Sequence, residues 1–148
     1  MSVPARLKLL DPVLQQMLNG AGAPARRRAA LTVSKLAVDR AGIADPRLAT
    51  ALARLQSGGY GDSPERRAVQ ALTEELDDVA WHVQGQVDTG NADKADYVKA
   101  FAKARAANAV WYALDADPLE AAAEATYEAS AAIDNPEAVR TAIQGASA

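Results

Sequence analysis

The densest group of side chains capable of chemistry lies between residues 74 and 82. Glu75, Asp78 and His82 are spaced by three and four residues, so they would project from one face of a helix. Carboxylate oxygens suit Mg²⁺ or Mn²⁺, whereas zinc is disfavoured because the chain has one histidine and no cysteine. A solvated acidic face is the alternative, since runs of charge on a helix usually face water. The cluster therefore predicts either a divalent-cation site or a plain charged surface.

Residues 74–81, with the sequence EELDDVAW, resemble the second metal-binding helix of MazG-like nucleotide pyrophosphohydrolases. Glu75 and Asp78 match the Glu-x-x-Asp unit of that family, and the resemblance implies an all-α hydrolase of nucleoside triphosphates that uses Mg²⁺. The family also carries a Glu-x-x-Glu pair on the preceding helix. Here residues 43–62 contain no glutamate and offer Arg47 and Arg54 instead. Half a metal site does not offset the dehydration of Mg²⁺, so the hydrolase is kept as the alternative hypothesis.

No other motif in the chain points to catalysis. The absence of cysteine excludes thiol chemistry, disulfides and cysteine metal sites. The glycine-rich residues 58–61 lack the preceding strand, the lysine and the serine or threonine that a phosphate loop requires. We therefore expect a non-enzymatic protein without a cofactor, and Mg²⁺ belongs only to the hydrolase alternative.

The predicted contact surface is the acidic side of the same helix. Glu74, Asp77 and Asp78 lie off its apolar stripe, and Trp81 also lies off the stripe and is expected to be exposed. Acidic side chains accelerate encounter with a basic partner, and a tryptophan supplies buried area at the centre of an interface. These four residues predict a bacterial protein-binding module of the immunity-protein, adaptor or assembly-subunit type. Its partner would be another, basic protein, and self-association stays open.

Four arginines and two aromatic residues have competing interpretations. Residues 26–28 are three arginines in the first turn of a predicted helix, where they oppose the helix dipole. An anion site or acidic partner would explain them, and so would a solvated patch. Arg105 flanks an aromatic stripe, and we expect it to pair with Glu75 or Asp78 of the facing helix. Trp111 and Tyr112 are expected to fill the core, although large aromatics also mark interfaces.

The elements that position these residues are outlined by helix-capping residues that directly precede proline. The capping side chain accepts an N–H of the first turn, and proline at the first helical position has no N–H to lose. The five pairs are Asp11-Pro12, Asp45-Pro46, Ser63-Pro64, Asp117-Pro118 and Asn135-Pro136. Together with apolar periodicity they predict helices near residues 12–18, 25–40, 46–56, 64–87, 93–114, 118–133 and 136–144.

The longest predicted helix has the clearest periodicity and sits at the centre of the expected fold. Its apolar residues recur at steps of three and four, at Val69, Leu72, Leu76, Val79, Val83 and Val87. We expect it to pair antiparallel with the helix at residues 93–114. The fold class predicted is all-α, a compact bundle or short α–α stack of six to seven helices, with residues 1–148 as one helical domain.

Composition bounds the remaining function classes. The formal charge of −3 argues against a general binder of nucleic acid or anionic membranes. No apolar run approaches the ~20 residues that a membrane span needs, nor does the start of the chain have a signal-peptide core. We therefore expect a soluble, cytoplasmic protein that binds neither nucleic acid nor membrane.

Overall fold

The computed structural model describes residues 6–147, and within that range the chain is helical throughout, without strands. The all-α fold class is confirmed, with eight helices in place of the six to seven expected. They are α1 (Arg6–Leu10), α2 (Pro12–Gly20), α3 (Ala23–Ala41), α4 (Pro46–Gln56), α5 (Pro64–Asp88), α6 (Lys94–Ala113), α7 (Pro118–Ala132) and α8 (Pro136–Ser147). The additional element is α1, which ends just before Asp11, the residue that caps α2.

All five predicted caps form. In each case the side-chain oxygen of the capping residue accepts a backbone N–H from the first turn of its helix. The donors are the N–H groups of Leu14, Arg47, Arg66, Leu119 and Ala138, respectively. At the other end of α3, Gly42 ends the helix in the left-handed conformation, with φ of 71°.

Small side chains hold the centre of the molecule together. Helices α3, α6 and α7 pack against one another, with α8 against α3, and α1 and α2 against α7. Their contact faces are rich in alanine, which lets the helix axes approach closely. Fully buried alanines include Ala29, Ala30, Ala106, Ala107, Ala121, Ala122 and Ala125. Val139 and Ile143 of α8 are also buried.

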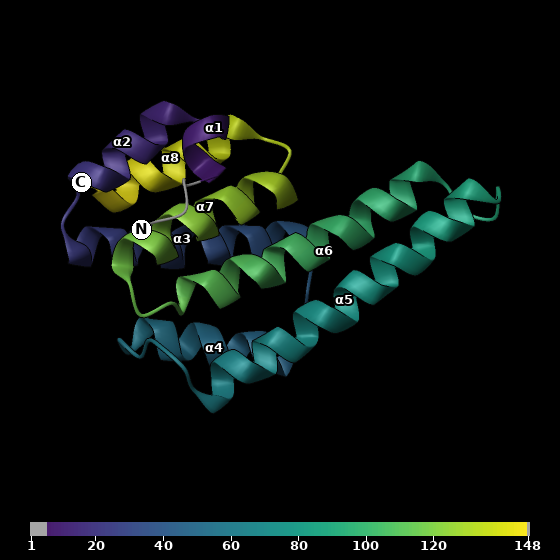
Figure 1. The fold of residues 1–148 in the computed structure, drawn as a ribbon, viewed down its shortest axis with the longest axis horizontal. Helices are drawn as coiled ribbons and strands as arrows, with labels where there is room; N and C mark the ends of the chain where they lie inside the picture. Colours follow the sequence, from purple (N-terminus) through teal and green to yellow (C-terminus); the bar gives the residue numbers. More distant parts are fainter. Residues whose placement is uncertain (1–5, 148) are drawn as a thin grey trace.

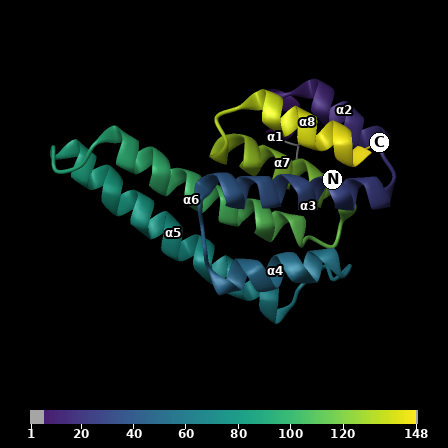
Figure 2. The same cartoon turned by 180° about the vertical axis from the view of Figure 1, so that it is seen from behind.

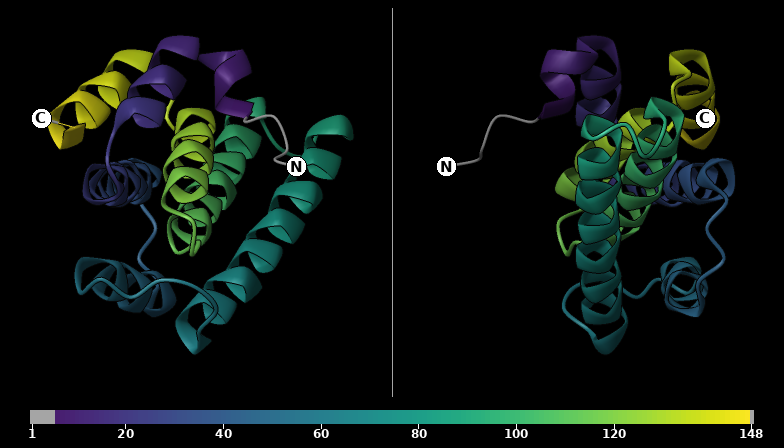
Figure 3. Two further views of the ribbon diagram at one scale, coloured as in Figure 1. Left: turned by 60° about the vertical axis from the view of Figure 1, so that its left-hand side comes forward. Right: turned by 90° about the vertical axis from the view of Figure 1, so that its right-hand side faces the viewer.

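Helices α5 and α6 form a long antiparallel hairpin, and its distal part extends beyond the other helices (Figure 1). The view from behind shows this part clear of α1, α2, α3 and α8 (Figure 2), and the left view of Figure 3 shows α5 apart from α3 and α8. Between residues 74 and 103 only Ala80 is buried. We call residues 74–103 the arm and the remaining described residues the body.

The apolar stripe of α5 changes character where the arm begins. Val69 and Leu72 are buried against the body, but Leu76 is half-buried and Val79 is 51% exposed. The prediction that Val79 faces inward is therefore wrong. The cause is that α4 packs beside only the first half of α5, with the first turn of α4 at Glu75, so no third helix covers the stripe farther along (Figure 1).

Candidate functional site

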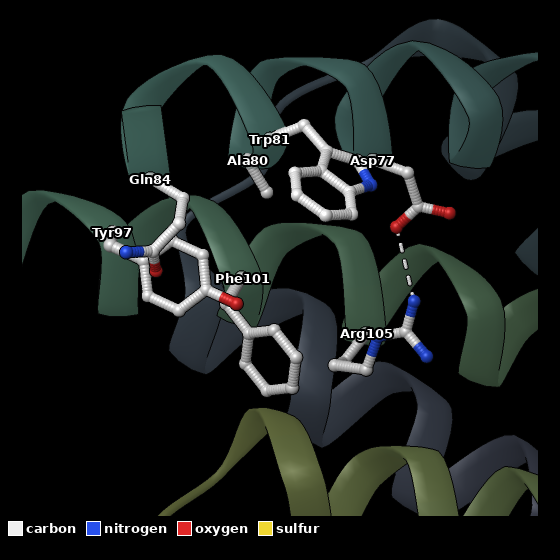
Figure 4. A pocket seen from close by; sticks show the side chains of 7 residues that line it. All are labelled: Asp77, Ala80, Trp81, Gln84, Tyr97, Phe101 and Arg105. Atoms are coloured by element: carbon white, nitrogen blue, oxygen red, sulfur yellow. Dashed lines mark hydrogen bonds and ion pairs between the residues drawn. The ribbon is translucent and has the colours of Figure 1, made fainter. Parts of the chain in front are cut away.

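A recess opens on one face of the hairpin at the root of the arm (Figure 4). Its volume is about 430 Å³. The α5 residues that line it recur at steps of three and four, which places them on one helical face, and the α6 residues are spaced by four. The lining residues are Asp77, Ala80, Trp81 and Gln84 from α5 and Tyr97, Phe101 and Arg105 from α6.

Aromatic rings form most of the apolar wall of this recess. The Tyr97 and Phe101 rings lie on α6 with their centroids 6.0 Å apart and tilted by 32°. Trp81 lies across from them on α5, and 77% of its surface is exposed (Figure 4). The expectation that Trp81 is exposed is confirmed. Tyr97 and Phe101 of α6 are only half-buried and reach this surface.

Arg105 closes the end of the recess nearest the body. Its Nη2 donates to Asp77 Oδ1 at 3.0 Å, and its Nη1 donates to Glu128 Oε2 at 3.2 Å. The predicted partner helix of Arg105 is thus correct, but the predicted residues, Glu75 and Asp78, are wrong. Asp77 faces α6, whereas the other two carboxylates lie on parts of α5 that turn away from it.

Glu128 on α7 is a buried charged partner of Arg105 that the sequence analysis does not predict. Its side chain is 2% exposed and also accepts a 2.9 Å bond from Arg6, which additionally bonds Glu124. Desolvation lowers the pKa of Arg6, but its bonds to the two carboxylates outweigh this, so the net pKa is raised. The sequence does contain a signal for this network. Glu124 and Glu128 are four residues apart on an alanine-rich helix, and small side chains around them indicate that this part of the helix is buried.

Asp77 therefore differs from the other predicted contact residues. Its side chain is 45% exposed, but one oxygen is bonded to Arg105. The prediction that Asp77 is an unpaired residue of the contact surface is therefore wrong, although its side chain still reaches the surface. Glu74 and Asp78 are exposed residues of α5, as predicted.

The two carboxylates of the alternative metal site, Glu75 and Asp78, have different surroundings. Glu75 forms an ion pair with Arg47 of α4, which also bonds Asp45 at 3.0 Å. The cap Asp45 has its pKa lowered chiefly by this hydrogen bond from Arg47. Asp78, three residues farther along α5, is exposed. Across residues 6–147, no three His, Asp or Glu side chains gather closely enough to hold a metal ion.

The three consecutive arginines at the start of α3 reach the carboxyl ends of three different helices. Arg26 donates to the Leu18 carbonyl at the end of α2 at 2.8 Å, and Arg28 donates to the Ala146 carbonyl of α8 at 3.1 Å. Arg27 donates to the carbonyls of Asp115 and Ala116, just beyond α6, at 2.6 and 2.7 Å. These carbonyls have no intrahelical partner and carry the negative end of the helix dipole. Neither an anion site nor a solvated patch describes this cluster, because its guanidinium groups are structural.

Trp111 and Tyr112 pack against the core, as expected. Trp111 contacts Tyr112 edge-on, and the Arg66 guanidinium lies 3.9 Å from the centroid of the Trp111 ring. Arg66 also donates to the Trp111 carbonyl at 3.1 Å. Both aromatic residues thus belong to the body rather than to the recess.

The fold and the site define an all-α protein that carries an aromatic-lined recess on a projecting helical hairpin. Comparisons of the chain with protein-family models, with curated proteins and with solved structures give no match. None of the helices within residues 6–147 has the length and apolar composition needed to cross a membrane.

Proposed function

We propose that this chain is a non-enzymatic bacterial protein-binding module, of the immunity-protein, adaptor or assembly-subunit kind, which engages a basic partner through its arm. The observation that carries the proposal is the position of Trp81. A tryptophan with 77% of its surface in water, beside a recess and among carboxylates, has the composition of an interface centre. Tryptophan is among the residues that contribute most binding energy when a partner buries them.

The charge distribution of α5 supports a basic partner. From residue 68 to residue 93 the chain contains no lysine or arginine, whereas Glu74, Asp77, Asp78 and Asp88 are all acidic. Glu74 and Asp78 flank Trp81 on the exposed part of the helix. Such a one-signed surface steers a partner of opposite charge and raises its association rate.

The proposal is tested by comparing what the wild type and an arm variant capture. The variant combines Glu74→Lys, Asp78→Lys and Trp81→Ala, and it spares Asp77 because Asp77 is bonded to Arg105. The matched control is Leu9→Ser with Val13→Ser, which changes exposed apolar residues of α1 and α2. Captured proteins are quantified by mass spectrometry from a lysate of cells that produce this chain, with the melting temperature of each variant as the folding check.

We expect a basic protein that is enriched by the wild type and by the control variant and lost with the arm variant. Equal capture by all three proteins would contradict the proposal. Mg²⁺-dependent turnover of a nucleoside triphosphate that is lost in Glu75→Gln would replace it with the hydrolase alternative.

A further inference from the structure

The aromatic rings of this protein follow a consistent packing rule. The chain has two tryptophans, four tyrosines and one phenylalanine. Five of these rings have an arginine guanidinium within 6 Å of the ring centroid, a distance at which cation–π attraction operates. The pairs are Arg27–Tyr60 at 3.6 Å, Arg66–Trp111 at 3.9 Å, Arg6–Tyr127 at 4.2 Å, Arg105–Phe101 at 5.5 Å and Arg6–Tyr112 at 5.6 Å.

The two exceptions are Trp81 and Tyr97, and both line the recess. No cationic side chain among the described residues lies over either ring. Trp81 on α5 and Tyr97 on α6 lie on opposite sides of the same opening (Figure 4). The faces of Trp81 and Tyr97 are therefore available to a cation from another molecule.

The electrostatics of the recess also suit a cation. Arg105 is balanced by Asp77 and Glu128, so it adds no unmatched positive charge at the opening. Arg105 bonds Oδ1 of Asp77, and the side chain of Asp77 remains 45% exposed. The nearby exposed carboxylates of Glu74 and Asp78 add further negative charge on the α5 side.

We propose that the recess is a receptor for one cationic side chain, arginine in preference to lysine, presented by the basic partner. The guanidinium would stack on Trp81 and face Tyr97. It would share the partly exposed Asp77 carboxylate with Arg105, and Glu74 and Asp78 would supply the remaining negative charge. A planar guanidinium stacks on aromatic rings and is more weakly hydrated than an ammonium group, which favours arginine. The volume of about 430 Å³ lies within the range of ordinary ligand sites. This inference rests on the proposed function and names the group that the partner inserts.

The test uses the full chain and short peptides of defined charge. The probe is a glycine–serine peptide with four arginines, and the matched peptides carry four citrullines or four lysines. Nuclear magnetic resonance follows the indole N–H signals, in which Trp81 is the sensor and Trp111, already stacked by Arg66, is the internal control. Fluorescence anisotropy of the labelled peptides gives the dissociation constants.

We expect the arginine peptide to shift the Trp81 signal in a saturable way, the lysine peptide to bind more weakly, and the citrulline peptide to leave it unchanged. Trp81→Ala should weaken the arginine peptide roughly 3- to 30-fold, whereas Val79→Ala on the other side of α5 should leave its affinity unchanged. Citrulline binding equal to arginine binding would overturn the inference in favour of an apolar site. Unchanged affinity in Trp81→Ala would also overturn the inference, because binding would then depend on surface charge and not on stacking.

A second copy of this chain is the rival occupant of the recess. If Trp81 shifts with protein concentration while sedimentation shows a doubled mass, the recess is a dimer contact and the cation site is wrong. Failure of the peptide test together with continued capture of a partner through the arm would refute this inference and leave the proposed function standing. Failure of the peptide test together with loss of partner capture through the arm would refute this inference and the proposed function.

Discussion

The body and the arm use their charged side chains in opposite ways. In the body, arginines bond to the carboxyl ends of helices, to buried carboxylates and to aromatic rings. In the arm, Glu74 and Asp78 are exposed, and the neighbouring Trp81 has 77% of its surface in water. The difference indicates that the arginines of the body stabilise the fold, whereas we propose that the exposed Glu74 and Asp78 of the arm serve recognition.

The contrast has a physical origin in the alanine-rich core. Alanine permits close helix packing but buries little apolar area per residue, so the body gains additional stability from bonds that connect separate helices. Arg27 joins the start of α3 to the end of α6, and Glu128 joins α7 to α1 and α6. The arm has only two helices along most of its length, so it has no third layer in which such bonds could be buried (Figure 1).

The largest difference is expected for apolar truncation. Leu114→Ala removes a fully buried side chain from the body and should lower the free energy of unfolding by about 2–5 kcal/mol through lost burial and a residual cavity. Val79→Ala in the arm should change it by less than about 0.5 kcal/mol, because Val79 is largely in water. Urea unfolding followed by circular dichroism measures both. Equal losses would mean that the division into body and arm does not describe the stability of the molecule.

The next largest effect is expected at the buried carboxylate. Glu128→Gln keeps the size of the side chain but leaves Arg6 and Arg105 with one carboxylate each, so stability should fall by about 2–3 kcal/mol. The matched control is Glu74→Gln on the exposed face of the arm, for which no measurable change is expected. If Glu128→Gln left the free energy of unfolding unchanged, the network between α1, α6 and α7 would not contribute to folding.

A smaller effect is expected for the arginines that bond to helix ends. Arg27→Met keeps an apolar stem but removes the bonds to the Asp115 and Ala116 carbonyls, which should cost about 1.5–3 kcal/mol. Burial lowers the pKa of Arg27, and the nearby groups Tyr60 and Asp115 act in the opposite direction. Arg67→Met is the control, because Arg67 pairs only with the exposed Asp62 and should contribute less than about 0.5 kcal/mol. Similar losses in the two variants would remove the structural role assigned to Arg27.

The smallest effect is expected for the pH dependence of stability that arises from Asp11. Desolvation raises the pKa of Asp11, but the bonds from Arg140 and the N–H of Leu14 outweigh it, so the folded pKa lies below its ordinary value. The resulting stabilisation is present above the unfolded pKa of about 3.9 and is lost as the pH falls through the folded value. Asp11→Asn retains a capping side chain, so it should lose under about 1 kcal/mol at pH 7 and converge with the wild type near pH 2.

Arg140→Met should reproduce that pH dependence, because it removes the same ion pair from the other side. Thermal melts across this pH range measure both variants. A constant offset between Asp11→Asn and the wild type at every pH would show that the ion pair is not the cause.

The parts of the structure that could be predicted from sequence depend on local signals. A capping side chain bonds to a backbone group within three residues, so each cap–proline pair identified the start of a helix without tertiary information. Exposure of Trp81 followed from its position off the apolar stripe. The burial predicted for Val79 is wrong because periodicity in α5 does not reveal how far the neighbouring helix α4 extends along it.

The missed contacts are all set by tertiary structure. Arg105 was assigned to the correct facing helix, but the register between α5 and α6 depends on the turn at residues 89–93, which sequence spacing does not determine. The partners of Arg26, Arg27 and Arg28 are backbone carbonyls up to 118 residues away along the chain. A carbonyl has no sequence signature, so these bonds were beyond prediction.

The most direct test of a recognition role for the arm is photocrosslinking at two exposed positions. The photoreactive residue p-benzoylphenylalanine replaces Gly85 on the arm in one protein and Leu9 on the body in the other, so that Trp81 itself is kept. Gly85 lies one helical turn beyond Trp81, is exposed and has open space for a side chain, and Leu9 is 87% exposed. Both proteins are irradiated in the cells that produce this chain, and the adducts are identified by mass spectrometry. The account predicts an adduct with one basic protein from position 85 and none from position 9. Adducts from position 9 alone would place recognition on the body and contradict it.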